Sequence, residues 1–271
     1  MNRINARFAN LKKKKEKALV GFVSAGDPSL KASLQLLTAM CHTGLDILEL
    51  GIPFSDPTAD GPVIQRASAR ALKNGATLAK AIEMAATLRK RTDIPIILFS
   101  YYNPIFAYGI GAFSRDSVAA GADGVLVVDL PHEESRELTD CWGGGDEFAL
   151  IRLVAPTTPR ERMKQIAEKA SGFLYLISKT GVTGSAGFEV GPIRDHVADL
   201  RAITDLPICV GFGIAHPAEA RALAPHVDGV VIGSAFARTI ADNLDTRDLI
   251  QRLEKQVREY KAAMKISPPQ D

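Results

Sequence analysis

Two carboxylates stand close together in one stretch of the sequence, residues 48–62. Glu49 lies inside the apolar run 46–50, which Gly51 and Pro53 bring to an end. A run of this kind between turn-forming residues is typical of a strand that is covered on both faces. Burying a carboxylate without a partner costs several kcal/mol or drives it to take up a proton. Glu49 therefore has either a structural partner or a role in proton transfer, and Asp60 is the second candidate acid.

Both acids also have ordinary structural explanations. The sequence Asp60-Gly61-Pro62 is typical of a helix start, with Asp60 as the N-cap residue and Pro62 in the first turn. Glu49 could belong to a buried ion pair, because such pairs also perturb carboxylates. The pattern alone leaves structural and catalytic roles open for both residues.

Composition excludes several classes of protein. The chain has 271 residues, of which 46% are hydrophobic, and its net charge is +2. That is enough apolar material for one large core, and it gives no reason to expect a nucleic-acid partner. The one basic run, 12–15, follows Ile4, Phe8 and Leu11 at helical spacing, so it is expected on the solvated face of a terminal helix.

Cysteine and histidine usage points to a cytoplasmic protein without a metal site. Cys41, Cys141 and Cys209 are odd in number and widely spaced, which fits reduced thiols better than a disulfide framework. The five histidines do not stand at the spacing of a metal motif. The sequence contains neither a signal region nor an apolar run of about 18 residues that would span a membrane.

Short apolar runs alternate with helical patterns along the whole chain. The predicted strands are 18–24, 46–50, 95–100, 124–128, 148–154, 173–178, 207–210 and 229–232. Such alternation over about 250 residues is typical of a (β/α)₈ TIM barrel. We predict a single α/β domain over residues 1–271, with an extra N-terminal helix and a C-terminal helix from about residue 245 to 263.

An open doubly wound sheet is the alternative to the barrel. The first strand is followed by Ala25-Gly26-Asp27 rather than by a glycine-rich dinucleotide fingerprint, which argues against that fold. In a barrel, the residues that follow the strands share one face, and barrel enzymes place their chemistry there. Glu49 and Asp60 would converge on that face.

The loops after the last three predicted strands could bind a phosphate. They contain Gly184, Gly213, Gly233 and Ser234, and Ser234 begins a short helical run. Glycine lets a ligand approach backbone N–H groups closely, and a helix N-terminus favours an anion. These glycines could also serve only as turn residues. Apolar residues near the strand ends could line the rest of a pocket or simply be core: Phe22, Ile64, Phe99, Leu126, Tyr175 and Phe212.

Together these motifs resemble the tryptophan synthase alpha subunit family over nearly the whole chain. The segment 48–62, Leu-Glu-Leu-Gly-Ile-Pro-Phe-Ser-Asp-Pro-Thr-Ala-Asp-Gly-Pro, is the most specific match. Further matches are Gly26-Asp27-Pro28, Tyr102-Asn103-Pro104, Asp129-Leu130-Pro131, 181–184 and 211–214. The resemblance implies cleavage of indole-3-glycerol phosphate to indole and glyceraldehyde 3-phosphate by a retro-aldol reaction, with no cofactor in this chain.

The resemblance also implies roles for individual residues. Glu49 would move the proton at ring carbon 3 and help to deprotonate the glycerol hydroxyl, and Asp60 would bind the indole nitrogen. Tyr175 would lie near the reacting carbon. The implied indole contacts are Phe22, Ile64, Leu126 and Phe212, and the implied phosphate donors are Gly184, Gly213, Gly233 and Ser234. Thr183 would lie in a closing loop and bond Asp60 when that loop closes.

The family likewise implies a partner. This is the tryptophan synthase beta subunit, which uses pyridoxal phosphate to join indole to serine in an alpha2-beta2 complex. The loop 53–60 would face that subunit. Two segments limit the resemblance to the family. The stretch 141–145 precedes the fifth strand, on the face away from the chemistry, and is expected to affect stability. The loop 184–191 is rich in glycine and is expected to move when the site is empty.

Two other functions compete with this interpretation. Lys179, just after the sixth predicted strand, could form a Schiff base as in lysine-dependent barrel aldolases. Alternatively, the chain could be a binding subunit that activates a partner and has little catalysis of its own. The pair Glu49 and Asp60 favours chemistry over the second alternative.

Overall fold

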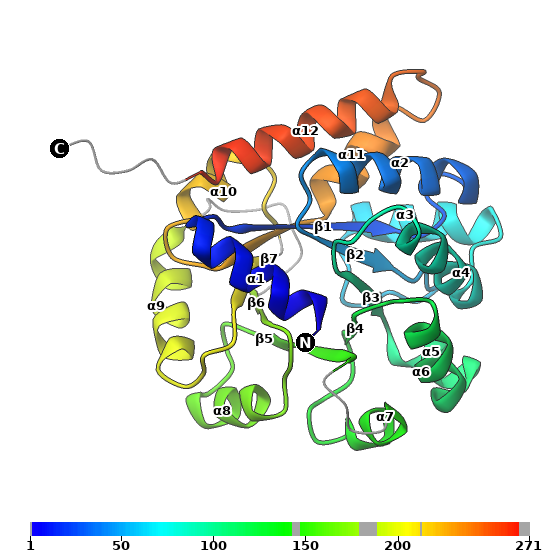
Figure 1. Ribbon diagram of the computed structural model, residues 1–271. Helices are drawn as coiled ribbons and strands as arrows, with labels where there is room; N and C mark the ends of the chain where they lie inside the picture. Colours follow the sequence, from blue (N-terminus) through cyan, green and yellow to red (C-terminus); the bar gives the residue numbers. More distant parts are fainter. Residues whose placement is uncertain (1, 143–146, 179–188, 212, 266–271) are drawn as a thin grey trace.

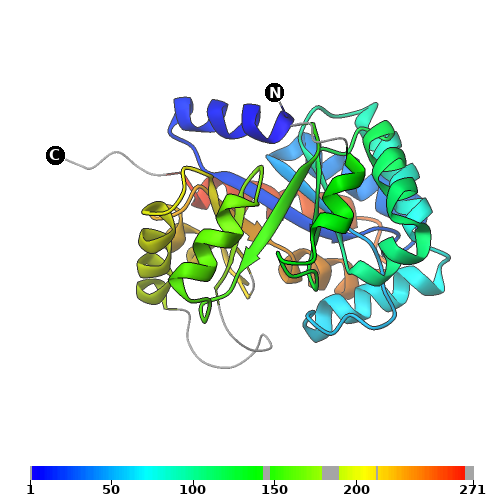
Figure 2. The same ribbon diagram turned by 90° about the horizontal axis from the view of Figure 1, so that it is seen from below.

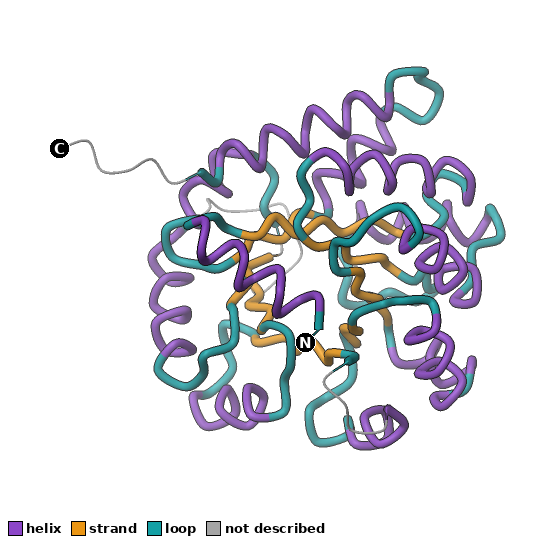
Figure 3. The backbone as a smooth tube through the Cα atoms, viewed as in Figure 1, coloured by secondary structure: helices purple, strands orange, loops and turns teal. Residues whose placement is uncertain are grey.

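The computed structural model describes residues 2–142, 147–178, 189–211 and 213–265. Its strands form a closed parallel barrel, in which each strand pairs with the next and β8 pairs with β1. Figure 1 and Figure 3 show the helices arranged around this ring of strands. The predicted barrel is therefore confirmed.

The strands lie where the apolar runs predict them. Their bounds are β1 (Ala18–Ser24), β2 (Ile47–Gly51), β3 (Ile96–Ser100), β4 (Gly124–Val127), β5 (Ala149–Val154), β6 (Leu174–Ile177), β7 (Ile208–Gly211) and β8 (Gly229–Ile232). No bound differs from the prediction by more than one residue. The predicted and observed bounds agree because a strand that is covered on both faces is apolar along its whole length, so the apolar run marks where it begins and ends.

Helices follow the strands in the expected alternation. Their bounds are α1 (Arg3–Lys14), α2 (Leu30–Thr43), α3 (Pro62–Lys73), α4 (Leu78–Arg89), α5 (Tyr102–Tyr108), α6 (Ile110–Ala119), α7 (Arg136–Thr139), α8 (Arg160–Glu168), α9 (Val190–Arg201), α10 (Pro217–Leu223), α11 (Ser234–Asp242) and α12 (Leu249–Ala263), with a 3₁₀ turn at Asp140–Trp142. The described chain contains no helix long and apolar enough to cross a bilayer.

The C-terminal helix begins later than predicted. Instead of starting near residue 245, α12 starts at Leu249. Thr246 donates to the Asn243 carbonyl from both its backbone N–H and its hydroxyl group, and these bonds close a turn before the helix. A side chain that competes for backbone groups in this way favours a turn over a helix.

Strand alternation divides the apolar residues into two layers. Val20, Ile47, Ile97 and Ile151 point into the barrel, whereas their strand neighbours pack outward against the helices. Glu49 is two residues after Ile47 and therefore faces the barrel interior.

Helix α1 closes one end of the barrel. Ile4, Phe8 and Leu11 are buried in the interior cluster, and the rings of Phe8 and Phe173 lie 5.8 Å apart. Figure 2 shows this helix lying across the end of the strands. The helical spacing of the three apolar residues predicted this buried face, and the basic run 12–15 lies mostly exposed beside it.

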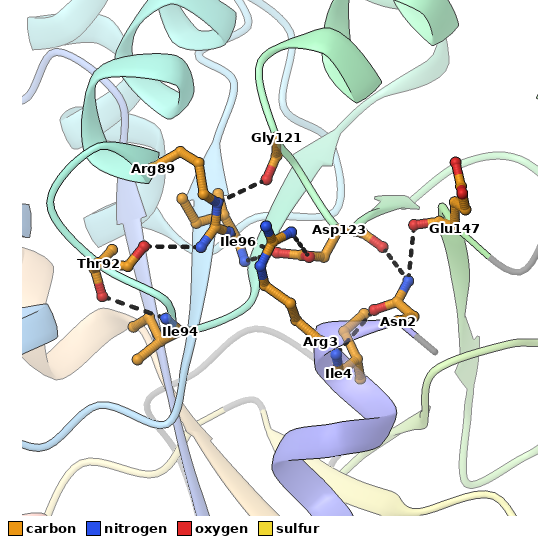
Figure 4. Close-up of polar contacts among 10 residues, drawn as sticks. All are labelled: Asn2, Arg3, Ile4, Arg89, Thr92, Ile94, Ile96, Gly121, Asp123 and Glu147. Atoms are coloured by element: carbon orange, nitrogen blue, oxygen red, sulfur yellow. Dashed lines mark hydrogen bonds and ion pairs between the residues drawn. The ribbon is translucent and has the colours of Figure 1, made fainter.

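Asp123 fixes α1 to the barrel (Figure 4). Its carboxylate accepts hydrogen bonds from Arg3 at 2.9 Å, from Arg89 at 2.7 Å and from the backbone N–H of Ile96 at 2.8 Å. Asn2 donates to the Asp123 carbonyl at 2.8 Å. These contacts lie at the amino ends of the strands, so they stabilise the barrel at the end away from the candidate site.

Candidate active site

A pocket opens at the carboxyl ends of the strands. It encloses about 580 Å³ of space outside the protein atoms, including open solvent at its mouth. Its lining residues are Phe22, Glu49, Asp60, Gly61, Val63, Ile64, Phe99, Tyr175, Gly213, Ile214, Val231, Gly233 and Ser234. The structure thus brings both candidate acids into one largely apolar pocket with the glycines of the last two strand loops.

Glu49 is fully buried on β2. In the barrel register it lies between Phe22 of β1 and Ile97 of β3. Neither carboxylate oxygen has a hydrogen-bond partner among the residues that the structure describes. Burial raises the pKa of Glu49 to about 8, because a charge is costly where water is excluded. The ion-pair explanation for Glu49 finds no support in this arrangement, and the side chain is protonated at neutral pH.

Asp60 lies in the loop between β2 and α3. The N-cap residue of α3 is Gly61, and α3 has no side-chain cap. The alternative role of Asp60 as the helix cap is therefore wrong. The Tyr101 hydroxyl donates to the Asp60 carboxylate at 3.2 Å instead. Burial raises the pKa of Asp60 to about 6, and the bond from Tyr101 opposes that rise, so Asp60 is charged at neutral pH.

Tyr101 connects Asp60 to its loop. Its hydroxyl also accepts a hydrogen bond from the backbone N–H of Ala59 at 2.9 Å. The side chain is buried directly after β3, and its ring lies 5.3 Å from that of Phe54. Tyr101 is a site residue that was not predicted from the sequence. Its place at the end of a strand, before Tyr102-Asn103-Pro104, was the available signal.

Aromatic rings form one side of the pocket. Phe22 and Phe99 meet edge to face, with ring centroids 5.0 Å apart. A Cβ atom on Gly51 would lie 2.6 Å from the Phe22 ring, and one on Gly211 would collide with the Tyr175 hydroxyl. These two glycines therefore leave the room that both rings occupy. Tyr175 is buried, and burial raises the pKa of its hydroxyl well above the ordinary value.

The predicted apolar contacts divide into three groups. Phe22 and Ile64 line the pocket, as does Phe99, which we had noted near the strand ends without assigning it to the site. Leu126 is buried in the interior cluster but is not among the lining residues. Phe212 lies outside the described residues. The alternation of side chains along β4 predicts that Leu126 points into the barrel. How far it lies from the mouth of the pocket depends on the register between the strands, which the alternation does not give.

The pocket also offers backbone donors, where α11 begins and in the loop after β7. Gly233 is the N-cap residue of α11, and Ser234 is its first residue. Gly213 has φ +82°, a conformation that favours glycine. The described lining residues include no lysine or arginine, so an anion here would depend on neutral N–H and O–H donors and the helix dipole. Thr183, Gly184 and Lys179 lie outside the described residues.

Comparison with known proteins assigns the family. The family profile described as tryptophan synthase alpha chain matches residues 8–265. A tryptophan synthase alpha chain of Desulfosudis oleivorans is 60% identical, over 98% of this chain and the whole of that protein. This chain belongs to the tryptophan synthase alpha chain family. Another member, from Desulfatibacillum aliphaticivorans, is 58% identical over 97% of this chain and 99% of its own length.

Solved structures agree with this assignment. The tryptophan synthase alpha subunit of Legionella pneumophila superimposes with a TM-score of 0.88 and 37% identity, covering 97% of this chain and 98% of that one. A tryptophan synthase structure from M. tuberculosis in an aminoacrylate-bound form gives 0.87 with 29% identity, covering 98% and 100%. The chain is accordingly a lyase of tryptophan biosynthesis that cleaves indole-3-glycerol phosphate.

The raised pKa of Glu49 should make folding stability depend on pH. In the unfolded chain the carboxyl loses its proton near pH 4.5, but in the folded chain it keeps the proton to about pH 8. The contribution of Glu49 to stability is therefore complete below pH 4.5 and is lost as pH rises to 8, by about 4 kcal/mol. Denaturant unfolding at pH 5 and pH 8 should show this loss in the wild-type chain, and Glu49→Gln should remove it. An equal pH dependence in the two proteins would contradict the assigned protonation.

Proposed function

We propose that Glu49 and Asp60 divide the chemistry of indole-3-glycerol phosphate cleavage between proton transfer and charge stabilisation. The observation that carries this proposal is the contrast between the two acids. Glu49 is buried, without a hydrogen-bond partner among the described residues, and protonated, whereas Asp60 accepts a hydrogen bond and is charged. Two carboxyl groups whose environments separate their pKa values are suited to different roles in one reaction.

The reaction would begin with protonated Glu49. Its carboxyl gives a proton to ring carbon 3 of the indole, and the positive charge that develops on the ring nitrogen faces the Asp60 carboxylate. The Glu49 carboxylate then takes the proton of the neighbouring glycerol hydroxyl. As the aldehyde forms, the carbon–carbon bond breaks and its electrons return to the ring. Indole and glyceraldehyde 3-phosphate result, and Glu49 regains its proton.

The shape of the pocket supports one orientation of the substrate. The indole ring would lie against Phe22, Ile64 and Phe99, since flat aromatic groups pack well edge to face. Tyr175 would lie beside the glycerol chain. The phosphate would bind at Gly213, Gly233 and Ser234, where α11 begins, and Gly184 and Thr183 are proposed to complete the site. Phe212 and Leu126 are proposed as further indole contacts.

The domain organisation, the location and the partner of the chain are also proposals. The chain would act as one domain in the cytoplasm, consistent with the free thiols of its cysteines, and pass indole to a beta subunit that carries pyridoxal phosphate. The loop 53–60 supports this coupling. Tyr101 bonds both Ala59 and Asp60, and Ser68 bonds both backbone groups of Phe54, so a partner that contacts this loop would also act on Asp60.

Indole release tests this function. Purified chain and indole-3-glycerol phosphate should give slow indole release, and a beta subunit should accelerate it strongly. Fast release by the chain alone would indicate a free-standing lyase. No release with or without the partner would instead support a binding subunit. Borohydride should not trap an adduct at Lys179, and a trapped adduct would support the Schiff-base alternative.

Tyr101→Phe should reduce activity through its effect on Asp60. The variant loses the hydroxyl that bonds the Asp60 carboxylate and the Ala59 N–H. We expect about a tenfold loss of kcat/KM. Because the lost bond favours charged Asp60, the acid limb of the pH profile should move to higher pH. The control is Tyr102→Phe, whose hydroxyl bonds Glu137 instead. Equal effects of the two substitutions would contradict the role of Tyr101.

A further inference from the structure

The motif Gly26-Asp27-Pro28 follows β1 and has no part in the proposed mechanism. Asp27 is an acid with an exposed fraction of only 1%. Both of its carboxylate oxygens accept hydrogen bonds from one side chain, Arg70 of α3, whose Nε donates at 2.8 Å and whose Nη2 donates at 2.9 Å. Such a bidentate pair fixes direction as well as distance, because the guanidinium is a planar fork. The pair therefore orients α3 relative to the end of β1.

Helix α3 has an unusual place in the barrel. Two helices follow β2, and α4 is the one that packs against β2 and against its neighbours α2 and α5 in the outer ring. α3 packs instead against β1 and α11. Gly61, Val63 and Ile64, at the start of α3, line the active-site pocket. α3 is thus an additional helix that lies beside the pocket, and its position affects the shape of the site.

Asp60 is attached to the start of α3. It directly precedes Gly61, the N-cap residue of the helix, and Pro62 in the first turn restricts the backbone there. The Gln65 side chain donates to the Asp60 carbonyl at 2.9 Å. A movement of α3 would therefore move the Asp60 backbone, whereas Tyr101, which bonds the Asp60 carboxylate, follows β3. The place of the carboxylate depends on both attachments.

The second half of α3 carries the contacts that fix it. Besides the pair with Asp27, the Ser68 hydroxyl bonds both backbone groups of Phe54, in the loop that leads to Asp60. The C-cap residue, Asn74, donates from its side chain to the Pro28 carbonyl at 2.5 Å. Hydrogen bonds between charged groups are about twice as strong as neutral ones. The pair with Asp27 is therefore the strongest of these three anchors.

Stability alone would account for a buried ion pair. Burial raises the pKa of the Asp27 carboxyl, and the bonds and charge of Arg70 oppose that rise. Arg70 thus compensates a buried acid, as any cationic partner would. A role in stability does not explain why the pair fixes the additional helix beside the pocket, which begins directly after Asp60.

We propose that Arg70 and Asp27 are positioning residues for Asp60. Their ion pair sets the place of α3, and α3 sets the place of the Asp60 carboxylate against the ring nitrogen of the substrate. This inference rests on the charge-stabilising role proposed for Asp60. Neither Arg70 nor Asp27 is among the described lining residues of the pocket, so their effect on the reaction passes through α3. A displacement of about 1 Å can cost about a hundredfold in rate.

Two substitutions weaken the pair from opposite sides. Asp27→Asn removes the buried charge and one acceptor without changing the size of the side chain, and water can reach Arg70, whose side chain is 24% exposed. We expect kcat for indole release by the isolated chain to fall about tenfold. Arg70→Lys keeps the charge but cannot form the fork, so it should give a similar loss. Arg66→Lys, at an exposed arginine of the same helix, should leave kcat unchanged.

Combination with Asp60→Asn separates positioning from stability. If the pair acts through the Asp60 carboxylate, Asp27→Asn should lower kcat by less than about twofold once that carboxylate is gone. The same tenfold loss in both backgrounds would overturn the proposal. So would variants of the pair with wild-type kcat and only a lower free energy of unfolding.

Arg70→Lys supports the same comparison if Asp27→Asn fails to fold, because it leaves a cation beside the buried acid. The Asp60→Asn single variant distinguishes the two levels of the argument. A normal kcat in that variant would contradict the proposed role of Asp60 itself. A low kcat in that variant, together with an undiminished loss from Asp27→Asn or Arg70→Lys in its background, would contradict only the positioning role.

Discussion

Glu49→Gln is expected to lower indole release by about a thousandfold or more. The amide is close to a protonated carboxyl in size and polarity, so the buried site should keep its shape. It cannot give a proton to ring carbon 3 and then take one from the glycerol hydroxyl. Because the wild-type carboxyl is already neutral in the fold, its replacement costs no ion pair among the described residues.

Single-turnover release of indole, followed by its absorbance, checks this expectation. Far-UV circular dichroism and phosphate binding should match the wild-type chain. Glu161→Gln, an exposed acid on α8, serves as the matched control and should keep full activity. If Glu49→Gln retained activity within tenfold of the wild-type chain, Glu49 would have no part in proton transfer.

Asp60→Asn should have the second-largest effect, a loss of about a hundredfold or more in kcat. The carboxylate is charged at neutral pH. In the proposed mechanism it faces the ring nitrogen that becomes positive as carbon 3 is protonated. An amide keeps the volume and can still accept a hydrogen bond from Tyr101. It cannot stabilise the developing charge, so kcat should fall more than KM rises.

Steady-state kinetics with the isolated chain separates these two quantities. Asp56→Asn is a suitable control, because Asp56 is an exposed acid of the same loop and bonds Ser55. It should leave both kcat and KM near their wild-type values. An Asp60→Asn enzyme with normal kcat and a raised KM would show that Asp60 only binds the substrate.

The sequence predicted the barrel and much of the pocket because those features depend on short-range patterns. Strand alternation places Glu49 inward, two residues after Ile47, and the strand-to-loop order places Gly213, Gly233 and Ser234 at the same end as Glu49. Only the closed barrel could bring these loops together, and the eight regular runs were sufficient to predict that closure.

Contacts between distant segments could not be predicted in the same way. The bond from Tyr101 to Asp60 joins the residue after β3 to the loop between β2 and α3, and no local pattern separates that role of Tyr101 from core packing. Arg152 stands in a strand that is otherwise apolar, and its partners, Ser135 and Lys169, come from two different connections. The N-cap role of Asp60 was wrong for a related reason, since Gly61 is the N-cap residue of α3 and the side chain of Tyr101, which follows β3, bonds Asp60.

The most direct test of the mechanism is the titration of Glu49 itself. Chain labelled with ¹³C at the glutamate side-chain carboxyl gives one resonance for each glutamate, and the spectrum of Glu49→Gln identifies the one that belongs to residue 49. We predict that this carboxyl titrates near pH 8, so that Glu49 holds its proton at neutral pH. A carboxyl already charged at pH 5 to 6 would contradict proton donation by Glu49 as the first step.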